Sequence, residues 1–126
     1  METTTGCASA LIIAKPGPLR DGVQALMTAM PQIATVYETS DLSSALVMVF
    51  DRRPALVVLD SGLGKGEIRP AVRRVKARWP QARCVFLADD VEQQQEGQSA
   101  DADAALIKGL PATRLITVVL GLLPGS

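Results

Sequence analysis

Short apolar runs alternate with amphipathic stretches along most of the chain, and this alternation predicts the elements and their order. Apolar runs of strand length occur at 8–14, 33–39, 55–59, 83–88 and 104–107. The run from Ala55 to Leu59 follows Pro54 and leads into Asp60, which is typical of a strand buried on both faces of a parallel sheet. A buried helix is the alternative, but glycines at 62, 64 and 66 end the run too early for one.

Between these runs, apolar residues recur every three or four positions, as on a helix with one buried face. The helical stripes are Leu19, Val23, Leu26 and Met30; Leu42, Ala45, Leu46, Val49 and Phe50; Ile68, Val72, Val75 and Trp79; and Leu115, Val118, Val119 and Leu122 in a last helix at 111–123. Ser40 or Asp41 is expected to cap the second of these. Residues 91–100 are polar and weakly patterned but fit one more helix. This alternation predicts an α/β fold with a doubly wound, five-stranded parallel sheet in the flavodoxin-like strand order 2-1-3-4-5.

Length and composition fit one ordinary domain. The chain has 126 residues, and we expect a tail at 1–7, the domain at 8–123 and a linker or terminal segment at 124–126. Hydrophobic residues make up 48% and aromatic residues only 3%, so the core must consist of aliphatic side chains. No signal peptide and no run of membrane-spanning length is evident, which favours a cytoplasmic location.

Charge and residue usage exclude several kinds of chemistry. Thirteen basic residues balance thirteen acidic ones, so we expect neither direct nucleic-acid binding nor attraction to membranes. The chain has no histidine, which excludes Ser-His-Asp triads, Cys-His pairs and metal sites with histidine ligands. Cys7 and Cys84 lack the spacing of zinc ligands. The glycine-rich loop after Asp60 does not match the phosphate-binding loop of nucleotide hydrolases.

Three strand ends carry the residues considered for the site: Lys15-Pro16 after the first strand, Asp60 after the third and Lys108 after the fifth. Carboxyl ends of parallel strands meet at one edge of the sheet, where α/β proteins bind ligands. We therefore expect Lys15 and Asp60 to be adjacent, with Lys108 approaching from the far side of the fourth strand.

Three motifs resemble those of a known family. They are Leu-Ile-Ile-Ala-Lys15-Pro16-Gly-Pro-Leu-Arg-Asp-Gly, Arg-Pro-Ala-Leu-Val-Val-Leu-Asp60 and Ala-Asp-Ala-Ala-Leu-Ile-Lys108-Gly109. The chain thereby resembles the receiver domains of two-component response regulators over roughly residues 8–123, and especially those that precede LuxR-type helix-turn-helix domains.

This resemblance implies a signalling module without enzymatic turnover. Asp60 would be the phosphoacceptor and Lys108 the lysine that pairs with the phosphoryl group, because an acyl phosphate needs cations to hold its charge. The implied partners are a sensor histidine kinase, a second copy of the chain and a DNA-binding output domain that lies beyond this sequence.

The sequence also departs from the family pattern. Lys15 and Pro16 replace the acidic pair that binds a divalent ion, Ala88 replaces the switch hydroxyl, and Ala105 replaces the switch aromatic. We therefore expect no cofactor and impaired Mg²⁺-dependent phosphorylation, since magnesium needs oxygen ligands. One hypothesis is that Lys15 stands in for the metal and pairs with Asp60.

The last helix suggests a partner surface. Besides its core face it carries Ile116, Leu120 and Leu123, which predicts a homodimer interface. Two other functions stay open: a phosphorylation-independent dimerisation or scaffold module, and a small flavodoxin-like ligand-binding protein or enzyme.

Overall fold

The five apolar runs form the five strands of one parallel sheet. The computed structural model describes residues 8–48, 53–63 and 68–123. In chain order the elements are β1 (Ala8–Ile13), α1 (Pro18–Ala29), β2 (Ile33–Thr39), α2 (Leu42–Leu46), β3 (Leu56–Asp60), the short 3₁₀ helix η1 (Ser61–Leu63), α3 (Ile68–Arg78), β4 (Arg83–Ala88), α4 (Val91–Ser99), β5 (Ala104–Ile107) and α5 (Ala112–Leu122). The strand order is β2-β1-β3-β4-β5 and every pairing is parallel, which confirms the predicted fold class.

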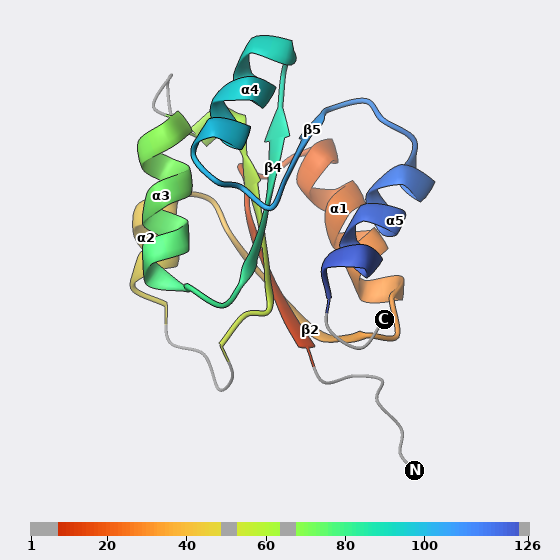
Figure 1. The fold of residues 1–126 in the computed structure, drawn as a ribbon. Helices are drawn as coiled ribbons and strands as arrows, with labels where there is room; N and C mark the ends of the chain where they lie inside the picture. The colour runs from red at the N-terminus through yellow and green to blue at the C-terminus, as the bar shows by residue number, and fades with distance from the viewer. Residues whose placement is uncertain (1–7, 49–52, 64–67, 124–126) are drawn as a thin grey trace.

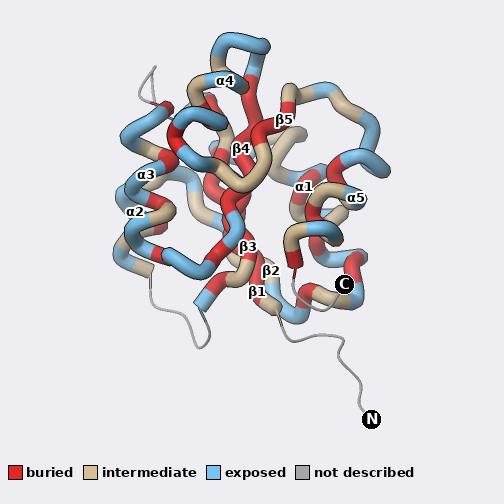
Figure 2. The backbone as a smooth tube through the Cα atoms, in the orientation of Figure 1, coloured by how far each residue is buried: buried red, intermediate tan, exposed pale blue. Residues whose placement is uncertain are grey.

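The central strand β3 is buried on both faces. It pairs with β1 on one side and β4 on the other, so that Leu59 lies opposite Ile13 and Phe86. Leu56 to Leu59 are almost completely inaccessible to solvent, and Figure 2 shows buried residues gathered along the strands. The next residue, Asp60, is thereby carried to the carboxyl edge of the sheet.

Alternate strand residues supply two separate cores, because successive side chains point to opposite faces of a sheet. One core contains Ile12 and Val58 and is covered by α1 and α5. The other contains Leu11 and Val57 and is covered by α2, α3 and α4. Figure 1 shows the two helical layers on either side of the sheet.

Close packing of α4 on the second core depends on a glycine. A Cβ at Gly97 would lie 2.5 Å from the Cδ2 atom of Phe86, a distance that real contacts do not reach. The ring of Phe86 is buried and fills the space beneath α4. This tertiary contact explains why so polar a segment forms a helix here, since its own hydrophobic pattern is weak.

Several element bounds differ from the prediction by one residue, as at β3, α4 and α5, and the second helix differs by more. β1 ends at Ile13, one residue earlier than expected, and α2 ends at Leu46; Val49 and Phe50 of the predicted second helix lie outside the described residues. Asp41 rather than Ser40 caps α2, and its Oδ1 accepts a hydrogen bond from the Ser44 N–H at 2.7 Å.

The structure contradicts one of the three residues predicted for a partner surface on the last helix. Leu123 is only 4% exposed and belongs to the first core, so its assignment to a partner interface was wrong. Leu120 also packs partly against that core, and Ile116 is half-buried. The helix is apolar on several sides because its residues share the first core with residues of α1 and of the strands, which a single-helix pattern does not show. Among the described helices, none has the length and apolar character to span a membrane.

Candidate functional site

The candidate site is built around the carboxylate of Asp60 at the carboxyl edge of the sheet. Its side chain is 12% exposed and lies at the end of β3, the strand between β1 and β4. The backbone N–H of Gly62, in η1, donates a hydrogen bond to Asp60 Oδ1 at 3.3 Å. A carboxylate in this position is reachable from solvent yet held by the protein on one oxygen.

The end of β5 brings a cation to this carboxylate. The Nζ atom of Lys108 lies 2.5 Å from Asp60 Oδ1, although 47 positions separate Lys108 from Ser61, the neighbour of Asp60. The backbone N–H of Lys108 donates to the Ala88 carbonyl at 2.8 Å, which fixes the chain next to the end of β4. The approach of Lys108 to Asp60 that the strand order predicts is therefore present in the structure.

Two further acceptors complete the surroundings of the Lys108 ammonium. Nζ lies 2.7 Å from Asp89 Oδ1 and donates to Ser61 Oγ at 3.2 Å. An ammonium has three N–H donors, and Asp60, Asp89 and Ser61 together match that number. Lys108 is thus saturated by its own chain.

Sequence reasoning missed the role of Asp89. Two acidic residues before a helix are typical of caps, but only Asp90 caps α4, accepting from the Gln93 N–H at 2.8 Å. A signal was present in the strand order: β4 and β5 are neighbours, and Ala88 pairs with Ile107. The residues that follow this pair in the two strands, Asp89 and Lys108, have opposite charges and form an ion pair.

The hypothesis of a Lys15–Asp60 ion pair is wrong in this structure. Lys15 is exposed, and within the described part of the chain it forms no ion pair with Asp60, whose cation is Lys108. Lys15 and Pro16 were predicted to follow the first strand directly and to replace the acidic pair. β1 ends at Ile13, so the two residues that follow it are Ala14 and Lys15. In either alignment no acidic side chain follows β1.

The residues present do not fit a magnesium site. A divalent ion needs several oxygen ligands, yet no three Asp, Glu, His or Cys residues in the described ranges gather to hold a metal. The Lys108 ammonium already contacts the carboxylates of Asp60 and Asp89, so the positive charge beside these two carboxylates is that of a lysine side chain.

Both switch positions lie on the second core face. Ala88 is fully buried at the end of β4, and Ala105 is buried in β5. The carbonyl of Ala105 accepts a hydrogen bond from Gln94 Nε2 at 2.8 Å, which ties α4 to β5. Neither alanine carries a hydroxyl or a ring, so neither side chain can donate to an anion at Asp60 or rotate an aromatic group.

The electrostatics of the site favour its charged form. Burial opposes the charge on Lys108, but hydrogen bonds and attraction to Asp60 and Asp89 outweigh burial and raise the pKa of Lys108 above 10.5. The hydrogen bond from Lys108 lowers the pKa of Asp89 below 3.8. At neutral pH the ammonium and the Asp89 carboxylate are therefore both ionised.

Comparison with solved structures shows that the fold is that of response-regulator receiver domains. The structure superposes with a TM-score of 0.78 on a LuxR family DNA-binding response regulator from Silicibacter pomeroyi, at 22% identity, over 95% of this chain and 94% of that one. The signal receiver domain of an HD domain-containing protein from Pseudomonas fluorescens superposes with a TM-score of 0.81 at 17% identity, over 98% of this chain and 91% of that one. The chemotaxis response regulator CheY4 of Vibrio cholerae superposes with a TM-score of 0.76 at 18% identity, over 92% of this chain and 98% of that one. No protein-family model and no curated protein matches the sequence.

Proposed function

We propose that this chain is an atypical receiver domain, a phosphorelay signal-transduction module in which Asp60 occupies the phosphoacceptor position. The observation that carries the proposal is the contact between Asp60 Oδ1 and Lys108 Nζ at 2.5 Å, at the carboxyl edge of a receiver-type sheet. In the proposed reaction an Asp60 oxygen forms a bond to the phosphorus of a phosphodonor, while the donor's leaving group departs with the electron pair of the bond that breaks. Lys108 then balances part of the charge on the acyl phosphate.

The proposed reaction lacks a carboxylate that would help Asp60 to bind Mg²⁺. Ala14, Lys15 and Pro16 follow β1, so the edge beside Asp60 offers no second carboxylate from that strand. We propose that Mg²⁺-dependent phosphorylation is correspondingly impaired. Because Ala88 and Ala105 lack the hydroxyl and the ring, an acyl phosphate would also change the β4–α4 region less than in a domain that has both.

The direct test is treatment with acetyl phosphate and Mg²⁺, followed by intact-protein mass spectrometry. We expect slow, partial addition of one phosphoryl group to the wild type and none to Asp60→Asn. The variant Lys15→Asp adds an oxygen ligand and removes a positive charge at this edge, so it should be labelled faster and bind Mg²⁺ more tightly. Labelling of Asp60→Asn at the wild-type rate would place the acceptor elsewhere and refute the proposal.

A phosphorylation-independent scaffold is the second candidate, favoured by the saturated ammonium of Lys108 and by the alanines at 88 and 105. It predicts that the wild type and Lys15→Asp both remain unlabelled, while self-association is the same with and without phosphodonor.

A small-molecule binder is the third candidate, favoured by a cavity of about 350 Å³ that reaches Lys108. It lies between α1 and the start of α5, and its mostly apolar lining includes Leu19, Val23, Leu87, Leu110 and Leu115. A flavin or nucleotide that raises the unfolding temperature of the wild type would support this function.

The proposed partners follow from the proposed module. They are a sensor histidine kinase, a DNA-binding output domain beyond this chain and a second copy of the chain, all in the cytoplasm. For the homodimer, Ile116 and Leu120 remain half-buried on α5, whereas Leu123 does not take part. Sedimentation of Ile116→Asp tests this surface: a dimeric wild type and a monomeric variant would support it, and the same mass for both would contradict it.

A further inference from the structure

The Lys108 ammonium has one partner that a simple acceptor–lysine pair would not contain. Asp89 comes from the connection between β4 and α4, and its carboxylate is 55% exposed. Its Oδ1 lies 2.7 Å from Nζ, nearly as close as Asp60 Oδ1. Both carboxylates thus contact the same nitrogen and share one positive charge.

The backbone on each side of Asp89 is tied to its neighbours. The N–H of Asp89 donates to Gln93 Oε1 at 2.7 Å, within the first turn of α4. Just before it, the carbonyl of Ala88 accepts the N–H of Lys108 at 2.8 Å. The backbone of Asp89 is therefore bound to the first turn of α4, while its side chain is bound to Lys108 beside Asp60.

The charge balance sets Asp89 against any anion that joins Asp60. Asp60, Asp89 and Lys108 together carry one excess negative charge when ionised. A phosphoryl group on Asp60 adds further negative charge and strong acceptor oxygens next to the same ammonium. Like charges at this separation repel, so Asp89 and the phosphoryl group compete for Lys108.

We propose that Asp89 is an internal anionic ligand of Lys108: it holds the β4–α4 connection at the Asp60 edge without a phosphoryl group, and it must leave when an anion binds there. The holding role requires only the observed ion pair, whereas the displacement role rests on the proposed function. In this way Asp89 supplies a link between the site and α4 that the side chain of Ala88 cannot make, and it sets how readily the site accepts an anion.

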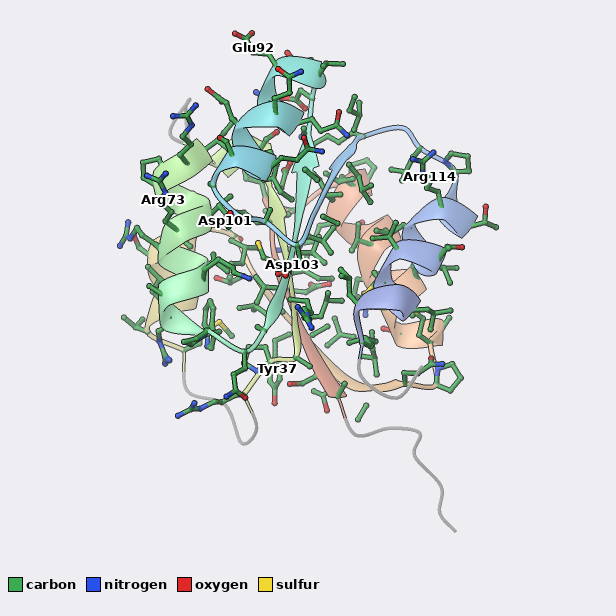
Figure 3. All side chains as sticks on the ribbon, viewed as in Figure 1. Tyr37, Arg73, Glu92, Asp101, Asp103 and Arg114 are labelled. Atoms are coloured by element: carbon green, nitrogen blue, oxygen red, sulfur yellow. The ribbon has the colours of Figure 1, made fainter. Side chains whose placement is uncertain are left out.

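Amide hydrogen exchange on the full chain tests the holding role. In Asp89→Asn the amides of residues 89–94 should exchange about two- to fivefold faster than in the wild type, the factor expected for loss of a mostly exposed ion pair. Glu92→Gln is the matched control, because it removes the same charge from an exposed side chain in the first turn of α4 that points away from the domain (Figure 3). Unchanged exchange in Asp89→Asn, or equal acceleration in both variants, would overturn the proposal.

Beryllofluoride, a phosphoryl mimic, tests displacement. With Mg²⁺ present, Asp89→Asn should bind it at least about fivefold more tightly than the wild type or Glu92→Gln, and adding Asp60→Asn should abolish that binding. Equal affinity for the wild type and Asp89→Asn would overturn the competition. No binding to either protein, together with faster exchange in Asp89→Asn, would count against Asp60 as an acceptor and still support the holding role.

Discussion

Among the described residues, two partly buried carboxylates bind lysines, and the charges around them differ. Asp103, just before β5, accepts hydrogen bonds from Lys76 Nζ at 2.8 Å and from the Cys84 N–H at 2.7 Å. Arg83 Nη1 lies 3.4 Å from its other oxygen. Figure 3 shows Asp103 within the body of the domain, whereas Arg73 on α3 points outward. Two cations and one buried backbone donor therefore share one acid.

The Asp60 site reverses this balance. There one cation, Lys108, is shared by the two carboxylates of Asp60 and Asp89. The side chains of Asp60 and Asp103 are similarly buried, at 12% and 14% exposed. Exposure alone does not distinguish them, but their partners do: Asp103 satisfies a buried backbone group that the fold must pair, while Asp60 mainly contacts a side chain. The first stabilises the domain, and under the proposed function the second accepts the phosphoryl group.

The largest effect that this comparison predicts is on stability at Asp103. Asp103→Ala leaves the Cys84 N–H and Lys76 without their carboxylate, so the free energy of unfolding should fall by about 2–3 kcal/mol in urea titrations. Asp103→Asn keeps an acceptor for the N–H and should lose about half as much. Asp60→Asn should change stability by less than about 1 kcal/mol. A larger loss at Asp60 than at Asp103 would reverse the assignment of the two carboxylates.

The second prediction concerns the lysines. Lys108→Met leaves Asp60 and Asp89 facing each other without a cation, and should lower the free energy of unfolding by about 1–2 kcal/mol. Lys76→Met should cost only about 0.5–1 kcal/mol, because Arg83 and the Cys84 N–H still bind Asp103. Adding Asp60→Asn to Lys108→Met removes the repulsion, so part of the stability should return; failure to recover would mean that the two carboxylates are not coupled through Lys108.

These differences mark what the sequence could and could not reveal. Strand order and the meeting of Asp60 with Lys108 were predictable, because runs of apolar residues locate the strands and parallel strands end at one edge. The direction of a single side chain was not. Lys15 was expected to pair with Asp60, yet a long exposed side chain at a strand end has many directions open to it, and Lys108 takes the position.

Tertiary packing accounts for the remaining errors. Leu123 follows the last turn of α5 and enters the core, although the helical pattern placed it on the outer side. The pairing of Asp89 with Lys108 depends on the register of β4 and β5, whereas the local pattern of two acids before a helix indicates caps. Leu123 lies beyond the end of its helix, and the contact of Asp89 with Lys108 joins segments that are distant in the sequence. Neither can be predicted from the pattern of a single element.

The third prediction concerns acid. Burial raises the pKa of Asp103, but hydrogen bonds from Lys76 and the Cys84 N–H, with help from Arg83, outweigh it and lower the pKa below 3.8. Because the folded-state pKa is the lower one, Asp103 contributes stability above the unfolded value and loses it as pH falls through the folded value. Urea titrations at about pH 6 and about pH 3 should therefore show a larger decrease for the wild type than for Asp103→Asn, by less than about 1 kcal/mol. Equal decreases would show that Asp103 has the same pKa in both states.

The smallest effect is expected from Arg83→Gln, and it tests whether charge or the backbone donor dominates at Asp103. The Arg83 side chain is 53% exposed, and the carboxylate that it approaches is already bound by Lys76 and the Cys84 N–H. Surface ion pairs of this kind are weak and screened by salt, so the free energy of unfolding should fall by less than about 0.5 kcal/mol. Arg73→Gln, on an exposed position of α3, is the matched control for losing one positive charge. A loss above about 1 kcal/mol that high salt abolishes would show that the excess positive charge stabilises Asp103. In that case the contrast with the Asp60 site would lie in charge alone, and the backbone hydrogen bond would no longer explain why one carboxylate is structural and the other is available.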